Sequence, residues 1–432
     1  MTETAGPQPQ LHRVVRLPGA VFLGLGSIVG TGAFVSIGIA AGVAGPSVLL
    51  AIGLAGLLAT CNGLSSAQLA AAHPVSGGTY EYGYRYLNPT LGFTAGWMFM
   101  AAKSASAATA ALGLAGYLLD AFGLGSPGLR VAAGLTAVLA VTALVWHGTS
   151  RSNRANAAIV GVTLATLLLF VVVGAPAAAE GSATNLAELL PDRTGFRGLL
   201  EATALMFVAY TGYGRIATLG EEVSDPERTI PRAIILTLVV SALLYVTVGA
   251  VAVGSVGAPR LAELTASRAA PLEDAAMSFG GSTLAKILAF GAITAMLGVL
   301  LNLVLGLSRV LLAMARRGDA PGGLAAIDDA RSSPEAAVIA VGVVIGLLVL
   351  IGDVKTTWSF SAFTVLVYYA LTNLAALRLP AEAKRFPRWI PAAGLIGCLG
   401  LAFWVEWKIW AVGLLVIAAG FGWRHVVRLM AR

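Results

Sequence analysis

Charged residues are scarce in this chain of 432 residues: they make up 11%, against roughly 25% in a soluble domain. Hydrophobic residues account for 57%, and the mean hydropathy is +0.84. Because charges are what water solvates on a soluble surface, this composition excludes a soluble enzyme. The apolar runs continue for about 20 residues, the length of a membrane-spanning helix, and do not alternate like a barrel strand. The sequence therefore predicts an all-α integral membrane protein.

Cysteine and histidine are also rare. Cys61 and Cys398 lie in separate apolar runs, which excludes a disulfide framework and a CxxC metal motif. The four histidines form no HExxH motif and are scattered near the ends of apolar runs, at His12, His73, His147 and His425. The net charge of +7 comes from basic residues that are not interleaved with aromatics, so no nucleic acid is expected as a partner. We predict no catalytic residue, no metal site and no cofactor.

Twelve apolar runs are long enough to cross a hydrocarbon core of about 30 Å as helices. With a cytoplasmic N-terminus, 17 basic residues fall in inside segments and 8 outside, which predicts that both termini are cytoplasmic. Residues 1–16 and 425–432 are then tails of a multi-pass protein of the plasma (inner) membrane, with the lipid bilayer as partner. The predicted spans are 17–41, 45–70, 91–119, 129–147, 157–178, 199–219, 233–255, 284–314, 335–351, 356–377, 389–406 and 408–424.

No aspartate or glutamate lies near the middle of any predicted span. The acidic residues in or beside the spans lie near span ends, at Glu201, Glu335, Asp353 and Glu406. A binding pocket for a cationic side chain would normally supply a buried carboxylate. Lys103, in contrast, lies about 12 residues into its span, roughly 18 Å along a helix axis, without an acidic partner on that helix. An ionised group at that depth costs about 2.5–3.5 kcal/mol on insertion scales, so Lys103 is a functional candidate.

Two spans are rich in glycine at their centres. Four glycines fall within residues 24–32, and the sixth span carries Ala-Tyr-Thr-Gly-Tyr-Gly at 209–214. One interpretation is close helix packing; the other is two unwound segments, whose free backbone groups must line a cavity. The interrupted spans are the first and sixth of ten, which predicts inverted repeats of five helices at 17–178 and 197–378, followed by two helices at 389–424. The N-termini of the half-helices would face an anion, and the last carbonyls of the preceding halves would face a cation. Such a site suits a zwitterion such as an α-amino acid.

Four segments carry a family resemblance. They are GSIVGTGAF (26–34), PVSGGTYEY (74–82), AYTGYGRIATLGEEVSDPERTIPRAI (209–234) and SRVLLAMARRGDAP (308–321). In this order they resemble the amino acid–polyamine–organocation transporters, the amino acid permeases with a LeuT-type fold, over roughly residues 15–380. The resemblance implies twelve transmembrane helices, of which the first and sixth are broken.

The resemblance also implies a substrate site at the two breaks. It places the substrate carboxylate at the amides of Thr31 and Gly32, and the ammonium group at the carbonyls of Ile28, Val208 and Thr211. The other implied members of the site are Gly30 in the first break, Tyr210 and Tyr213 beside the substrate side chain, and Ala107 on the third span. Gate candidates in the loop behind the second break are Arg215, Glu221 and Glu222.

The family pattern is incomplete at the ion site. Many sodium-independent members carry a lysine in the fifth helix, and the aligned residue here is Thr163. The carbonyls of Gly26, Val29 and Gly291 and the Thr294 hydroxyl match a sodium site, but a neighbouring hydroxyl is replaced by Ala295. We therefore expect Lys103 to act as a titrating or built-in cation in place of sodium.

These observations favour a secondary active transporter that moves a neutral amino acid by alternating access, without sodium, either coupled to H⁺ or by exchange. A sodium-coupled symporter is the alternative of the same class. An ion channel and a non-transporting amino acid sensor are alternatives of other classes. The residues do not determine which amino acid is bound, whether transport is by symport or by exchange, or the oligomeric state.

Overall fold

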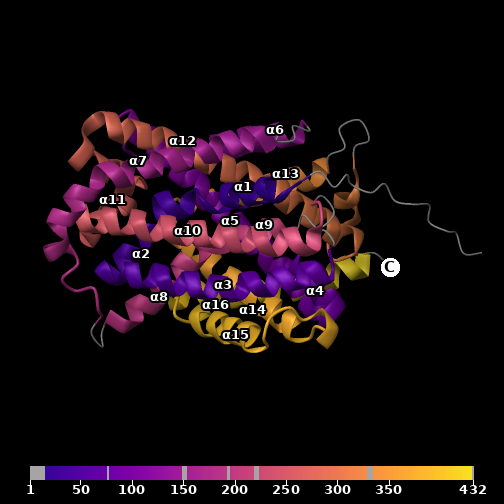
Figure 1. Cartoon of the computed structure of the whole chain (residues 1–432). Helices are drawn as coiled ribbons and strands as arrows, with labels where there is room; N and C mark the ends of the chain where they lie inside the picture. Colours follow the sequence, from indigo (N-terminus) through magenta and orange to yellow (C-terminus); the bar gives the residue numbers. More distant parts are fainter. Residues whose placement is uncertain are drawn as a thin grey trace, which may run out of the picture.

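The computed structural model describes residues 15–74, 77–147, 153–191, 195–217, 223–327 and 334–430. Within these ranges the regular structure is helical apart from one isolated bridge between Val15 and Val223. Figure 1 shows the long helices lying side by side along a common direction. This arrangement agrees with the all-α fold predicted from composition.

Sixteen α-helices are found in the described ranges. They are α1 (Leu17–Ile28), α2 (Ile37–Ala44), α3 (Val48–Ala72), α4 (Thr79–Tyr86), α5 (Pro89–Ala121), α6 (Pro127–Trp146), α7 (Asn153–Asn185), α8 (Gly195–Tyr210), α9 (Gly214–Ala217), α10 (Pro226–Val256), α11 (Ala258–Arg268), α12 (Pro271–Arg316), α13 (Glu335–Val349), α14 (Val354–Leu377), α15 (Trp389–Ala402) and α16 (Trp407–Met430).

Eight helical stretches of the described residues are long and apolar enough to cross a membrane. Two shorter apolar helices, α13 and α15, accompany them. Large apolar side chains also point outward, as at Leu57, Val172 and Leu347, which are between 62% and 68% exposed. An outer surface of this kind is stable against lipid and not against water, so the chain is a multi-pass membrane protein.

Some stretches between the predicted spans contain helices of their own. Residues 72–90 include α4, and residues 258–283 include α11 and the start of α12. α12 bends at Gly281, whose φ of 69° is a left-handed conformation suited to glycine. A capping side chain begins α5, where Asn88 accepts a hydrogen bond from the amide of Leu91 at 2.9 Å.

A buried carboxylate joins three helices at one end of the bundle. Asp319, just beyond α12, is 0% exposed and accepts hydrogen bonds from Tyr80 at 2.9 Å and from Tyr84, both on α4. Arg424 of α16 donates its Nε to the same carboxylate at 3.1 Å. A buried charge requires such compensation, so Asp319 fixes α4 and the C-terminal helix against the end of α12.

Candidate functional site

The first interruption lies where glycine content predicts it. α1 ends at Ile28, Val29 is extended with φ −83° and ψ 95°, and a π-helical turn follows over Gly32–Ser36 before α2 begins. The amide of Val29 still bonds the carbonyl of Leu25 at 2.7 Å, and the amide of Phe34 bonds that of Gly30 at 3.1 Å. The helical conformation is therefore interrupted at Val29 and Gly30, between two segments that keep hydrogen bonds of their own.

The second interruption lies against the first. α8 ends at Tyr210, a 3₁₀ turn covers Thr211–Tyr213, and the short helix α9 follows. A Cβ added at Gly212 would overlap the backbone carbonyl of Ser27 at the end of α1. Only glycine allows this approach of one backbone to another, so Gly212 brings the two interruptions together.

Two cavities lie at this junction and share part of their lining. The smaller holds about 30 Å³ and the larger about 150 Å³. Both are lined by Ser27, Lys103, Thr211, Gly212, Val299 and Leu303. The larger continues along α12 past Arg309, Val310 and Ala313 to Gly77 beside α4. The smaller is closed by Ile28, Thr31, Gly32, Ser106, Val208, Ala209 and Trp358.

The structure brings together most of the residues predicted to bind substrate. Ile28, Thr31, Gly32, Val208 and Thr211 line the smaller cavity. The remaining four lie beside it and line neither cavity. Gly30 packs on Val299, and Ala107 is 0% exposed. Tyr210 donates to the carbonyl of Ile52 at 3.2 Å, and the ring of Tyr213 is tilted against that of Tyr369 with centres 5.5 Å apart.

One polar atom in the smaller cavity has no partner within the described chain. The hydroxyl of Thr31 is buried and makes no hydrogen bond. Leaving a buried hydroxyl unpaired costs about 1–3 kcal/mol. A ligand that supplies an acceptor or donor at this point would recover that cost.

Lys103 reaches the second interruption from α5. Its Nζ donates to the Thr211 hydroxyl at 2.8 Å, and that hydroxyl donates to the carbonyl of Val208 at 2.8 Å. The lysine is 8% exposed and, among the described residues, is the one charged side chain that lines the smaller cavity. The cationic groups Arg215 and Arg309 line the larger cavity with it, and no carboxylate in the described part of the chain lines either cavity.

The carbonyls at the interruptions already accept hydrogen bonds within the protein. Tyr245 of α10 donates to the carbonyl of Ile28 at 2.9 Å, and Tyr369 of α14 donates to that of Thr211 at 3.2 Å. Because a carbonyl oxygen has two lone pairs, that of Ile28 retains capacity for a second donor, whereas that of Thr211 also accepts from the amide of Gly214. Neither tyrosine is singled out by the sequence, since an isolated aromatic residue in a span carries no distinctive pattern.

The ion-site candidates lie where α1, α7 and α12 pack together. The hydroxyl of Thr163 donates to the carbonyl of Ile159 at 2.8 Å, and that of Thr294 donates to those of Phe290 and Gly291 at 3.0 Å. Gly291 packs against Thr166, Gly26 packs against Asn156, and Val29 is buried. In the described ranges no cluster of His, Cys, Asp and Glu could hold a metal ion.

The gate candidates are only partly described. Arg215 lines the larger cavity, while Glu221 and Glu222 lie outside the described residues.

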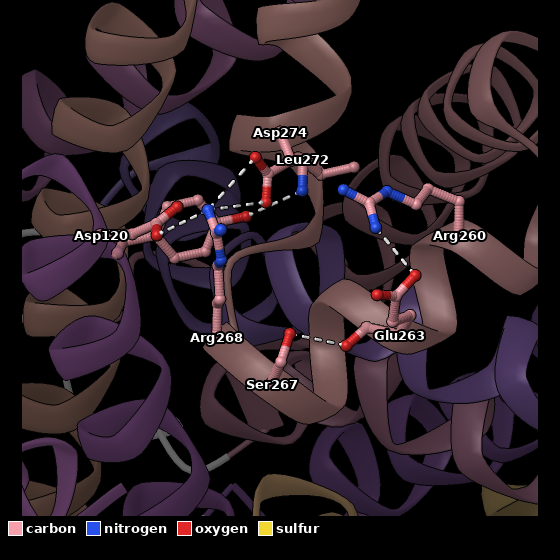
Figure 2. A network of polar contacts seen from close by, with 8 residues as sticks. Asp120, Arg260, Glu263, Ser267, Arg268, Leu272 and Asp274 are labelled. Atoms are coloured by element: carbon pink, nitrogen blue, oxygen red, sulfur yellow. Dashed lines mark hydrogen bonds and ion pairs between the residues drawn. The ribbon is translucent and has the colours of Figure 1, made fainter. Parts of the chain in front are cut away.

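The opposite side of the junction is closed by a polar network that the sequence does not predict (Figure 2). Tyr117 of α5 donates to the carbonyl of Phe34 at 2.8 Å and accepts from the amide of Leu272 at 3.4 Å. Arg268, at the end of α11, bonds Asp120 at 3.1 Å and Asp274 at 3.5 Å. These contacts tie α11 and the start of α12 to α5 and to the turn after the first interruption.

Comparison with known proteins supports a transporter. An uncharacterized transporter of Mycobacterium tuberculosis is 40% identical over 428 residues, which cover 98% of this chain and 94% of that protein. The branched-chain amino acid permease BcaP of Bacillus subtilis is 28% identical over 425 residues, 94% of this chain and 88% of that protein. The methylthioribose transporter of Bacillus subtilis is 28% identical over 452 residues, 96% of this chain and 95% of that protein.

A sequence model described as amino acid permease matches residues 19–427, nearly the whole chain. The match includes both helix interruptions and every described residue that lines the two cavities. The four resembling segments, the paired interruptions and this match lead to the same assignment. The chain belongs to the amino acid permease family.

Proposed function

We propose that this protein is a secondary active transporter that carries a neutral amino acid across the plasma membrane by alternating access. The observation that carries the proposal is the meeting of two interrupted helices at a partly polar cavity, within a chain of the amino acid permease family. Free backbone groups inside a membrane protein are tolerated where they line such a cavity.

The smaller cavity supplies the groups that an α-amino acid requires. The amides of Thr31 and Gly32 lie at the start of a new helical segment, whose dipole favours a carboxylate. The unpaired Thr31 hydroxyl adds a donor beside them. The carbonyl of Ile28 offers its second lone pair to the ammonium group. The substrate side chain would extend into the larger cavity.

The lining favours a neutral substrate. Lys103, Arg215 and Arg309 contribute positive charge to the two cavities, and no carboxylate among the described residues lines them. The apolar residues Val299, Leu303, Leu307 and Phe99 suit an aliphatic side chain. The relationship to a permease named for branched-chain amino acids agrees with this choice.

The closed and open ends of the site support alternating access. The larger cavity runs toward α4 and the end of α12, while the Tyr117 and Arg268 contacts close the other end. With the predicted cytoplasmic termini, this is an inward-facing state. The two interrupted helices would then correspond as the first helices of inverted repeats at 17–178 and 197–378.

Uptake into proteoliposomes tests the substrate class. We expect saturable, stereoselective uptake of leucine, isoleucine or valine to exceed that of arginine and lysine at least tenfold. Methylthioribose belongs in the same panel because one relative is named for it. Faster uptake of arginine or lysine would contradict the neutral class, whereas conductance without counterflow would indicate a channel.

Thr31→Val tests the carboxylate site. The substitution removes the unpaired hydroxyl and preserves shape, so unliganded thermal stability should stay equal or rise while substrate affinity falls about five- to tenfold. A thermal melt of the purified protein without substrate measures the stability, and titration with the amino acid measures the affinity. Thr203→Val on α8 is the matched control, because that buried hydroxyl bonds its own helix at the carbonyl of Leu199. An unchanged affinity in Thr31→Val places the carboxylate elsewhere.

Lys103→Met tests the coupling mechanism. If Lys103 replaces a coupling sodium ion, parent uptake should not require sodium and should vary with pH, whereas the variant should show a flat pH profile or exchange only. The exposed Lys355→Met is the control for loss of a lysine. Sodium-dependent uptake by the parent would instead favour the sodium-coupled symporter, and an unchanged pH profile in Lys103→Met would refute the role of the lysine.

Cysteine labelling tests the orientation. Ala183→Cys lies near the end of α7 and is predicted to be external, so an impermeant thiol reagent added to intact cells should label it. Ala381→Cys, between α14 and α15, is equally exposed and should be labelled only after the cells are opened. The reverse pattern would place both termini outside.

A further inference from the structure

Tyr245 occupies an unusual position on α10. Its side chain is 0% exposed, and its hydroxyl lies 2.9 Å from the carbonyl oxygen of Ile28 and 3.1 Å from that of Ala209. Ile28 is the last residue of α1, and Ala209 is the residue before the end of α8. One phenol therefore contacts the carbonyl ends of both interrupted helices.

Such a contact answers a specific electrostatic problem. The last carbonyls of a helix lack partners within it and carry the negative end of the helix dipole. At the junction two such ends converge away from water, where unpaired backbone groups are costly. The hydroxyl of Tyr245 is a neutral donor placed between them, shared as a three-centre hydrogen bond.

Neighbouring residues hold the phenol in place. Tyr210 packs edge-on against the ring, with centres 5.1 Å apart and an interplanar angle of 73°, and its own hydroxyl bonds Ile52 of α3. A Cβ added at Gly32 would lie 2.5 Å from the Tyr245 hydroxyl and 2.9 Å from the Cβ of Ala209. Gly32 thus leaves room for the hydroxyl, a packing requirement separate from access to a carboxylate.

We propose that Tyr245 is a positioning residue that holds the carbonyl ends of α1 and α8 at a fixed separation and thereby orients the Ile28 carbonyl toward the substrate ammonium group. Tyr245 lines neither cavity, so it acts through the carbonyls without touching the substrate. The orienting role rests on the proposed amino acid site, whereas the bridge between the helices does not.

Transport kinetics test the orienting role. Tyr245→Phe keeps the ring and removes the hydroxyl, so we expect KM for the preferred neutral amino acid to rise five- to tenfold while the maximal rate per folded molecule changes less than twofold. Tyr82→Phe is the control, since it removes a buried hydroxyl that has no partner within the described chain. A purely structural role would reduce the amount of folded protein without moving KM, and that result would overturn the proposal.

A double-mutant cycle on unliganded protein tests the bridge itself. Gly32→Ala should lower the melting temperature by several degrees in the parent and by clearly less in Tyr245→Phe, because the hydroxyl it collides with is gone. Gly24→Ala is the control: its Cβ meets Ile216 and Thr237, so its effect should add to that of Tyr245→Phe. Strict additivity for Gly32→Ala as well would refute the contact.

The two experiments separate the two proposals. If the parent binds no amino acid, the proposed function fails, and the cycle still decides whether the bridge exists. If the cycle shows coupling while Tyr245→Phe leaves KM unchanged, the bridge is real and its orienting role is wrong.

Discussion

Backbone groups released by a broken helix cannot turn to water inside a membrane protein, and the arrangement around the site follows from this constraint. Three hydroxyl groups donate to the carbonyls that the two interruptions expose. Tyr245 and Tyr369 donate to Ile28, Ala209 and Thr211, and the Thr211 hydroxyl donates to Val208 while it accepts from Lys103. The side chains of Lys103, Tyr245 and Tyr369 come from α5, α10 and α14, so each of these helices contributes a donor to the site.

The same constraint explains why a lysine is tolerated at this depth. A cation without a carboxylate partner is costly in a membrane, but here it lies near the carbonyl ends of a broken helix. The ammonium group of Lys103 donates to the Thr211 hydroxyl, and that hydroxyl donates to the carbonyl of Val208. A substrate carboxylate arriving at Thr31 would add a counter-charge to the same small cavity, so substrate and lysine would stabilise each other.

Sequence patterns predict features that depend on local chemistry and miss those that depend on packing between distant segments. Glycine at 24–32 and at 212–214 predicts the interruptions because glycine weakens a helix wherever it stands. The depth of Lys103 follows from counting residues along a span.

Tyr117, Tyr245 and Trp358 have no such signal, since a buried aromatic side chain acquires its role from the carbonyl it happens to face. Tyr210 and Tyr213 show the converse: they lie at the interruption, but their rings pack against Tyr245 and Tyr369 and line neither cavity. The helices α4 and α11 escape a search for apolar runs because both are amphipathic and short.

The Asp319 cluster has a consequence for biosynthesis. Its hydroxyl partners on α4 precede it in the chain, whereas Arg424 follows 105 residues later. During synthesis the carboxylate therefore meets two neutral donors first and receives its charged partner only when the C-terminal helix has been inserted. Until then the carboxylate has the two hydroxyl donors of α4 but not the cationic partner on α16. Docking of α16 thus completes the charge balance as well as the packing at this end of the bundle.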